Sequence, residues 1–328
     1  MVRKLSWKVG NVEVANPLVL APMEGVNCAS FRVLCKRAGA GLIYTDMVDT
    51  KQFLEILKAS RGDEETTVRQ VVNPQREERP LVIQIGGGNG DELAHVTQIL
   101  TRYADILDLN LGCPRSDMLG RKGGCYLMKH PNVLEKLLPS LTDNATVPLT
   151  AKIRSGWDLA SINAVEVAQL FERHGFSAIA IHARTREQRY RNKADWNVIR
   201  AVKEAVRIPV IGNGDVTKPY HAVTMFGQTT CDAVMIARGA MGDPSIFSRT
   251  LALLATGKEL SGPTREARFA SFREFVALYS RIEHRNKLSE LQDHASWWVA
   301  GLDDATALRE RIRRTRSEDD LQAIFTRA

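Results

Sequence analysis

The chain has 328 residues, 44% of them hydrophobic and 25% charged, which is the balance of an ordinary globular protein. This length exceeds the roughly 250 residues of one α/β barrel but is short for two full-sized domains. No stretch approaches the roughly 18 uninterrupted apolar residues of a membrane span, and no signal-peptide run opens the chain, so we expect a cytoplasmic protein. The net charge of +7 is compatible with a polyanionic partner.

Short apolar runs rich in Val, Ile and Leu recur eight times along the chain. Such continuous runs are typical of strands buried on both faces of a parallel sheet. The runs occupy residues 18–23, 42–48, 81–86, 106–112, 149–154, 178–184, 209–214 and 233–239. Segments with helical periodicity lie between them, at 93–103, 133–141, 165–174 and 197–206. The alternation predicts a (β/α)8 TIM barrel over residues 1–247, with a doubly wound open sheet as the alternative.

The pattern changes after residue 247, where no further strand-like run follows. Aromatic and aliphatic residues recur at helical spacing between positions 269 and 279, and Ser317 is typical of the N-cap of a last short helix. We therefore predict a small all-helical C-terminal domain over residues 248–328. The segment 261–263 (SGP) is its expected linker.

Polar and reactive side chains stand where the predicted strands end. In a TIM barrel these carboxyl ends open onto one face, which is where the active sites of such enzymes lie. We expect one shared site, built from Glu24, Asp46, Gln84, Asn110 with Cys113, Lys152, His182, Asn213 with Asp215, and Arg238.

Two glycine-containing loops follow the last two predicted strands, GNGDV at 212–216 and ARGAMG at 237–242. Barrels often bind phosphate at these loops through backbone N–H groups. Arg238 could add a charge-assisted contact, whereas Asp215 is better suited to orienting the loop. Tight turns alone would also favour these glycines.

Signatures of several other chemistries are missing. In GGGNGD at 86–91, Asp91 occupies the third glycine position of the dinucleotide fingerprint, which excludes a Rossmann fold. The five cysteines form no CxxC pair and no zinc-type spacing, so we expect free thiols, mostly buried, and no metal.

Three strand-end residues have the chemistry that a flavin ring and its substrate require. Lys152 could stabilise an anionic reduced ring, unless it pairs with Asp46 or Asp108. His182 could lie beside the ring or be a core histidine. Cys113, with an ordinary thiol pKa of roughly 8.5, is mostly protonated at neutral pH and therefore suits a proton donor, unless it is simply a small turn residue.

Basic residues gather in two clusters, 184–193 and 309–316, each with five basic residues against one acid. Either cluster could contact nucleic acid or be a solvated face.

Together these segments resemble the dihydrouridine synthase family. The resemblance spans nearly the whole chain and is carried by PLVLAPMEGV at 17–26, DLNLGCP at 108–114, HARTREQ at 182–188, KADW at 193–196, VIGNGDV at 210–216 and the tail 294–314. It implies an FMN-dependent oxidoreductase that reduces uridine to 5,6-dihydrouridine in folded RNA, most often tRNA. NADPH (or NADH) would be the reductant.

The resemblance also implies roles for individual residues. Hydride would pass from flavin N5 to C6 of the uracil, and Cys113 would protonate C5. The flavin contacts would come from Pro22, Met23, Glu24, Gln84, Lys152 and His182, and the phosphate contacts from Asn213, Gly214, Asp215, Ala237, Arg238 and Gly239. We expect the RNA contacts from Asn110, at the uracil edge, and from Arg184, Arg186, Arg311, Arg313 and Arg314.

The sequence departs from the family pattern in places. Residues 122–128 read KGGCYLM where many members carry GAGxxL, which offers Cys125 as a rival thiol. Asp293 and Ala300 stand where relatives often have lysines.

Three alternatives stay open. The substrate could be ribosomal RNA, the barrel could act on a small molecule as dihydroorotate dehydrogenases and ene-reductases do, or the chain could be a non-catalytic RNA-binding protein. We expect a monomer.

Overall fold

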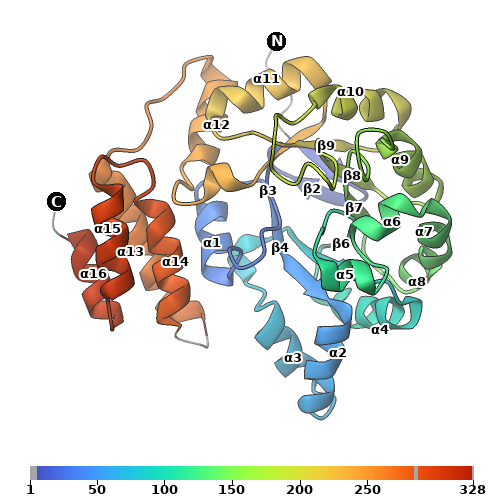
Figure 1. Cartoon of the computed structure of the whole chain (residues 1–328), viewed down its shortest axis with the longest axis horizontal. Helices are drawn as coiled ribbons and strands as arrows, with labels where there is room; N and C mark the ends of the chain where they lie inside the picture. The colour runs from blue at the N-terminus through green and yellow to red at the C-terminus, as the bar shows by residue number, and fades with distance from the viewer. Residues whose placement is uncertain (1–5, 284–286, 327–328) are drawn as a thin grey trace.

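The computed structural model describes residues 6–283 and 287–326, and its centre is a closed barrel of parallel strands (Figure 1). The strand order around the barrel is β10-β3-β4-β5-β6-β7-β8-β9. The strands are β3 (Leu18–Leu20), β4 (Leu42–Asp49), β5 (Leu81–Gly86), β6 (Ile106–Asn110), β7 (Leu149–Arg154), β8 (Ala178–His182), β9 (Val210–Asn213) and β10 (Ala233–Ile236). The predicted TIM barrel is confirmed, and the open-sheet alternative is wrong because β10 pairs with both β3 and β9.

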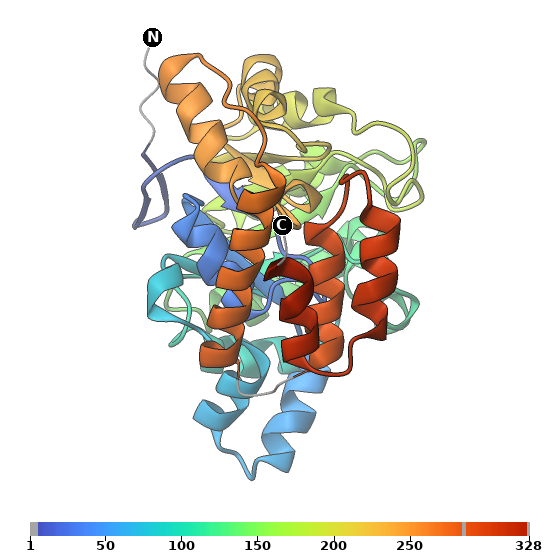
Figure 2. The same ribbon diagram turned by 90° about the vertical axis from the view of Figure 1, so that its left-hand side faces the viewer.

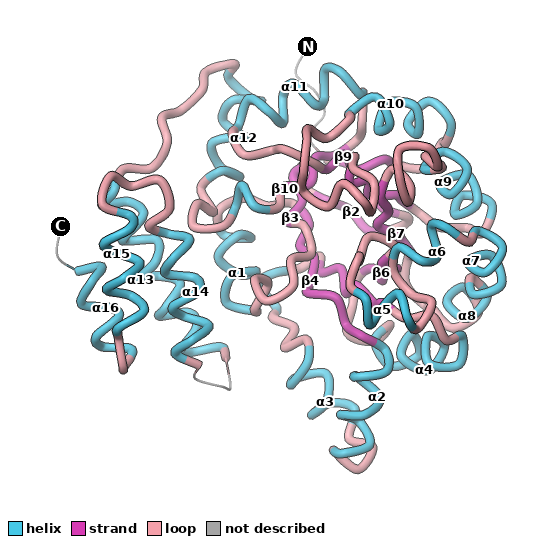
Figure 3. The backbone as a smooth tube through the Cα atoms, viewed as in Figure 1, coloured by secondary structure: helices cyan, strands magenta, loops and turns pink. Residues whose placement is uncertain are grey.

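The core has two layers because each barrel strand has an inner and an outer face. The inner cluster includes Val19, Tyr44, Val82, Ile211 and Met235, all buried. The larger outer cluster lies between the strands and the surrounding helices, which form a ring around the barrel (Figure 3).

A short antiparallel hairpin precedes the barrel and was not predicted. It consists of β1 (Trp7–Val9) and β2 (Val12–Val14). Val9 and Val14 join the inner cluster together with Leu42 and Ala178, the first residues of their strands. The hairpin therefore covers the amino end of the barrel and leaves the carboxyl end open to loops.

Helices follow the strands along the chain as expected. The barrel region contains α1 (Ala29–Arg37), α2 (Thr50–Ala59), α3 (Glu64–Val71), α4 (Gly90–Leu100), α5 (Ser116–Gly120), α6 (Cys125–Lys129), α7 (Pro131–Leu137), α8 (Pro139–Thr142), α9 (Ala164–Arg173), α10 (Trp196–Ala205), α11 (Pro219–Thr229) and α12 (Ile246–Thr256). Two 3-10 turns, η1 (Arg76–Glu78) and η2 (Arg238–Ala240), complete it. The helix predicted over 133–141 is divided at Pro139, which has no N–H to continue the hydrogen-bond ladder.

The C-terminal region is a bundle of four helices that lies beside the barrel (Figures 1 and 2). These are α13 (Arg265–Ile282), α14 (Leu288–Trp298), α15 (Ala305–Arg314) and α16 (Glu318–Thr326). Buried aromatic residues, among them Phe272 and Trp298, fill the bundle, and α13 packs on α1. The predicted helical region is confirmed, as is the N-cap, because Ser317 Oγ accepts the N–H of Asp320 at 3.1 Å.

The segment 261–263 connects α12 to α13. The predicted boundary at residue 247 falls inside α12, which packs on the barrel helix α11. No described helix is both long enough and apolar enough to cross a membrane.

Candidate active site

A cavity of about 360 Å³ opens at the carboxyl ends of the barrel strands. Its walls come from the ends of β7, β8 and β9 and from the loops after β3, β8, β9 and β10. Most of the side chains predicted for the cofactor line it: Pro22, Met23, Glu24, Lys152, His182, Asn213, Gly214, Asp215, Ala237, Arg238 and Gly239. Arg184, predicted to contact RNA, lines it too.

The loops after β9 and β10 leave little room for side chains and offer backbone donors. A Cβ on Gly239 would meet the carbonyl oxygen of Val216 at 2.4 Å, and Gly214 has a φ of +130°, which favours glycine. The backbone N–H groups of Arg238 and Gly239 have no acceptor among the described residues. Free donors beside a guanidinium group are suited to an anion such as phosphate.

Asp215, in the loop after β9, lines the cavity and also has hydrogen-bond partners that hold this loop in place. Its carboxylate accepts the N–H of Ala194 at 2.7 Å and two hydrogen bonds from Nη2 of Arg184, at 2.7 and 2.9 Å. Partial burial raises the pKa of Asp215, but these partners outweigh burial and hold it below its usual value. The buried Arg184 guanidinium therefore has a structural role in holding Asp215. It also donates a hydrogen bond to the carbonyl of Asn192 at 2.7 Å.

The cavity carries an excess of positive charge. Burial, followed by the repulsion of Arg154, lowers the pKa of Lys152 to about 8. Burial and the neighbouring cations, Lys152 foremost, lower the pKa of His182 well below its usual value, so the imidazole is neutral. A cationic, partly enclosed cavity is suited to an anionic ligand.

Lys152 forms no ion pair with any described acid. The two acids considered as its partners have other hydrogen bonds. Asp46 accepts the N–H groups of Gly25, at 3.0 Å, and Asn27, at 3.3 Å. Asp108 accepts from Gln84 and Thr150, and it acts on Lys152 only through its charge. The ammonium group therefore stays available to a ligand in the cavity.

Gln84 and Asn110 do not line the cavity; they belong to a buried series of hydrogen bonds. Gln84 Nε2 donates to Asp108 at 2.8 Å, and Asn110 Nδ2 donates to Gln84 Oε1 at 2.7 Å. Asn110 Oδ1 accepts the N–H groups of Gly112, at 3.0 Å, and Cys113, at 2.8 Å. This series of hydrogen bonds thus attaches the turn that carries Cys113 to the buried residues Asn110, Gln84 and Asp108.

Cys113 lies on the loop after β6 and is also absent from the cavity lining. The N–H of Leu111 donates to the carbonyl of Lys152 at 2.8 Å, so this loop begins directly beside the strand end that carries the lysine. The Cys113 side chain is 8% exposed. Burial raises its pKa more than the neighbouring Arg115 lowers it, so the group is a thiol at neutral pH.

Cys125, the rival thiol, is fully buried on the first turn of α6. Its backbone N–H donates to the carbonyl of Cys113 at 3.1 Å, and burial raises its pKa to about 11. With no exposed surface, its sulfur cannot reach a substrate, and Cys113 is the better candidate.

Tyr190 and Arg154 are among the residues of the site and its support that were not predicted. Tyr190 lines the cavity, 62% exposed, with its ring 4.7 Å from the guanidinium of Arg238 and 6.2 Å from the ring of His182. Arg154 Nε donates to the carbonyl of Gly112 at 2.8 Å and so braces the turn before Cys113. Tyr190 lies within the basic cluster 184–193, and Arg154 ends a predicted strand. Neither sequence position indicates that Tyr190 would contact Arg238 or that Arg154 would bond to Gly112.

The remaining predicted RNA contacts lie elsewhere. The guanidinium of Arg186 lies 4.6 Å from the ring centre of Trp157, as does the ammonium of Lys129. Arg311, Arg313 and Arg314 are exposed on α15 in the bundle, where Arg314 pairs with Glu310.

Comparison with known proteins gives consistent matches over most of the chain. A family model described as Dihydrouridine synthase (Dus) matches residues 19–327. The tRNA-dihydrouridine synthase B of Pseudomonas aeruginosa is 33% identical over 314 residues, which cover 95% of this chain and 92% of that protein. The protein of the same name from Yersinia pestis is 34% identical over 300 residues, which cover 88% and 90%.

Among solved structures, histamine dehydrogenase from Rhizobium sp. 4-9 matches with a TM-score of 0.53 and 12% identity. The match covers 84% of this chain and 51% of that one, and it indicates a shared fold alone.

Proposed function

The chain belongs to the dihydrouridine synthase family, and we propose that it reduces uridine to 5,6-dihydrouridine in tRNA, with FMN as bound cofactor and NADPH as reductant. The observation that carries the proposal is the cationic cavity at the barrel mouth, with its free backbone donors and its buried lysine. The relatives named above are tRNA-dihydrouridine synthases by name, which supports tRNA as the substrate class.

The residues of the cavity fit FMN. The unpaired N–H groups of Arg238 and Gly239, with the Arg238 guanidinium, would hold the phosphate. Lys152 would face the ring and stabilise negative charge on it, and neutral His182 would add a hydrogen bond. When bound and reduced by NADPH, FMN would supply the hydride for C6 of the uracil.

Cys113 would supply the proton to C5. Its raised pKa keeps the sulfur protonated at neutral pH, and Asn110 fixes its backbone. A pyrimidine can approach this thiol only after leaving its base stack, as other enzymes that act on a base require. Asn110 retains a second amide N–H, beyond the one given to Gln84, for the uracil edge.

The basic residues outside the cavity would hold the RNA. Arg186 on the barrel rim and Arg311, Arg313 and Arg314 on the bundle would contact phosphates, and such contacts do not depend directly on the RNA sequence. Because the bundle already supplies a second RNA surface, we propose that the protein acts as a monomer, in the cytoplasm.

The direct test is to map dihydrouridine in total RNA from cells with and without the gene. We expect dihydrouridine to disappear from defined tRNA positions and to return with the intact gene but not with Cys113→Ala. Loss from ribosomal RNA alone would contradict tRNA as the substrate. An unchanged map, together with reduction of orotate or free uridine by the purified protein, would indicate a small-molecule enzyme.

A further inference from the structure

A second and larger cavity, of about 780 Å³, lies between the barrel and the helical bundle. Its walls come from the loop before α1, from α3 and its following turn, and from the start of α14. Four carboxylates line it, from Asp46, Glu283, Glu290 and Asp293. It shares no lining residue with the cavity described above, and its four acids exceed its three basic side chains, Arg32, Arg69 and Lys287, by one.

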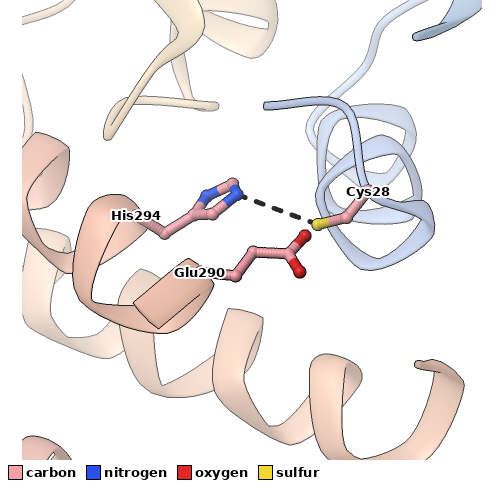
Figure 4. Close-up of side chains that lie close together, drawn as sticks. All are labelled: Cys28, Glu290 and His294. Atoms are coloured by element: carbon pink, nitrogen blue, oxygen red, sulfur yellow. Dashed lines mark hydrogen bonds between the residues drawn. The ribbon is translucent and has the colours of Figure 1, made fainter. Parts of the chain in front are cut away.

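Three side chains of types that can ligate a metal lie close together here (Figure 4), two of them, Cys28 and Glu290, in the wall of this cavity and the third, His294, buried next to them. The Cys28 sulfur, a Glu290 carboxylate oxygen and a His294 ring nitrogen all lie within 4.8 Å of one another. Cys28 is the residue before α1, whereas Glu290 and His294 stand four residues apart on α14 and therefore share one face of that helix. The cluster thus joins the barrel to the bundle.

The histidine of this cluster is poorly satisfied by protein partners. His294 is fully buried, and its only hydrogen-bond contact among the described residues is Nε2 to the Cys28 sulfur, at a long 3.8 Å. Its Nδ1 has no partner there. Aromatic rings enclose it, and that of Phe275 stacks at 4.3 Å. The nitrogen that faces the sulfur, Nε2, thus has no short hydrogen bond, and a bound ion is one of the recognised explanations for a buried polar atom in that position.

We propose that Cys28, Glu290 and His294 bind a zinc ion that clamps α14 of the bundle to the start of α1. Thiolate, carboxylate and imidazole are the three kinds of protein ligand that zinc takes. Thiolate and carboxylate together balance the charge of Zn²⁺, so the site is neutral when filled. The fourth position would face the cavity, where a water can complete the tetrahedron.

The surroundings of the ligands support this assignment. The hydroxyl of Tyr279 donates to Glu290 Oε2 at 2.9 Å, which orients the carboxylate as outer partners of metal ligands commonly do. The cavity, which Cys28 and Glu290 line, would provide a route for the ion to the site. Binding involves no oxidation: the Cys28 S–H bond breaks, the proton goes to solvent and a sulfur–zinc bond forms.

The test uses the full chain, stripped of metal by a chelator and then titrated with Co²⁺ or Zn²⁺ alone. We expect a single ion per chain and, with Co²⁺, the intense charge-transfer absorption of a cobalt–thiolate bond. Cys28→Ser should abolish that absorption and weaken zinc binding by more than about 100-fold, because loss of an outer partner alone commonly costs 10–100-fold. Cys35→Ser, which changes a buried cysteine of α1 outside the cluster, should leave both unchanged.

A second measurement needs no variant. Alkylation of Cys28 by iodoacetamide, located by mass spectrometry, should slow when Zn²⁺ is added and recover with chelator. Zinc should also raise the thermal unfolding temperature, because an ion bound only by the folded chain stabilises it. The proposal is overturned if Co²⁺ gives no thiolate absorption, if the Cys28→Ser variant retains that absorption, or if the rate of Cys28 alkylation does not change when Zn²⁺ is added.

Discussion

At the scale of single residues, the proposed chemistry depends on a protonated thiol held beside a cationic cavity. Cys113 combines slight exposure, a raised pKa and a backbone fixed by Asn110. These properties suit a group that gives up its proton only when a strong base develops next to it, as C5 of the uracil would during reduction.

Cys113→Ala should therefore lower turnover by roughly 10²–10⁴-fold, the usual contribution of a general acid, while flavin binding is retained. Single-turnover dihydrouridine formation and flavin absorbance measure the two quantities. Cys125→Ala is the matched control, and we expect it to change turnover by less than about tenfold. If the two variants exchange these effects, Cys125 is the acid.

Lys152 offers a test through pH. In the unfolded chain a lysine titrates near 10.5, whereas burial lowers the pKa of Lys152 to about 8 in the folded chain. Between these values the unfolded chain binds more protons, so the free energy of unfolding rises with pH across that interval. Burying the charged ammonium thus destabilises the flavin-free protein at pH 7, by up to about 3 kcal/mol.

Lys152→Met should consequently make the flavin-free protein more stable at pH 7 than the original chain, and the difference should shrink as pH rises above 8. Urea unfolding at several pH values measures it. The same variant should bind flavin more weakly. A variant that is less stable at pH 7 would show instead that the ammonium is mainly a structural partner of Asp108.

At the scale of elements, α15 carries the charges assigned to RNA binding. Leu308 and Ile312 face the bundle, and the exposed side of the helix presents Arg311, Arg313 and Arg314. An exposed basic face of this kind binds phosphates by releasing their counterions, which makes the affinity depend on salt.

Replacing these three arginines with glutamine should weaken tRNA binding and reduce the slope of log affinity against log salt by about 0.7–0.9 for each phosphate that the variant no longer neutralises. Filter binding at several salt concentrations gives the slope. Lys136, Arg200 and Arg207, exposed on the barrel side, provide a control triple with the same charge change. If the two triple variants change the affinity and the salt slope equally, the arginines of α15 are only a solvent-exposed face and not an RNA-binding surface.

Elements differed in how well the sequence predicted them. The barrel strands were predictable because burial on both faces demands uninterrupted apolar runs, as in β5 and β7. The hairpin β1–β2 was missed because its strands have three residues each and alternate apolar with polar residues around Lys8 and Glu13. Only the tertiary fold shows that Val9 and Val14 cover the barrel.

At the scale of the whole molecule, the barrel mouth was predictable and the seam between barrel and bundle was not. Parallel strands bring all their carboxyl ends to one face, so Lys152, His182 and Arg238 were expected to meet. The cluster at the seam unites Cys28 with His294, which are 266 residues apart and match no local spacing. The expectation that the chain holds no metal rested on such local spacings alone.

We propose that the barrel mouth binds a flavin whose electrons go to uridine in tRNA. The most direct test is the absorbance of the purified, flavin-loaded protein, followed first with NADPH and then with tRNA that lacks dihydrouridine. With oxygen excluded, we predict that NADPH bleaches the flavin and that adding the tRNA restores its colour, with dihydrouridine formed in proportion. Free uridine should not restore the colour. A preparation that stays colourless after flavin is supplied would contradict flavin binding. A bleached flavin that is not reoxidised by the tRNA would contradict uridine in tRNA as the electron acceptor.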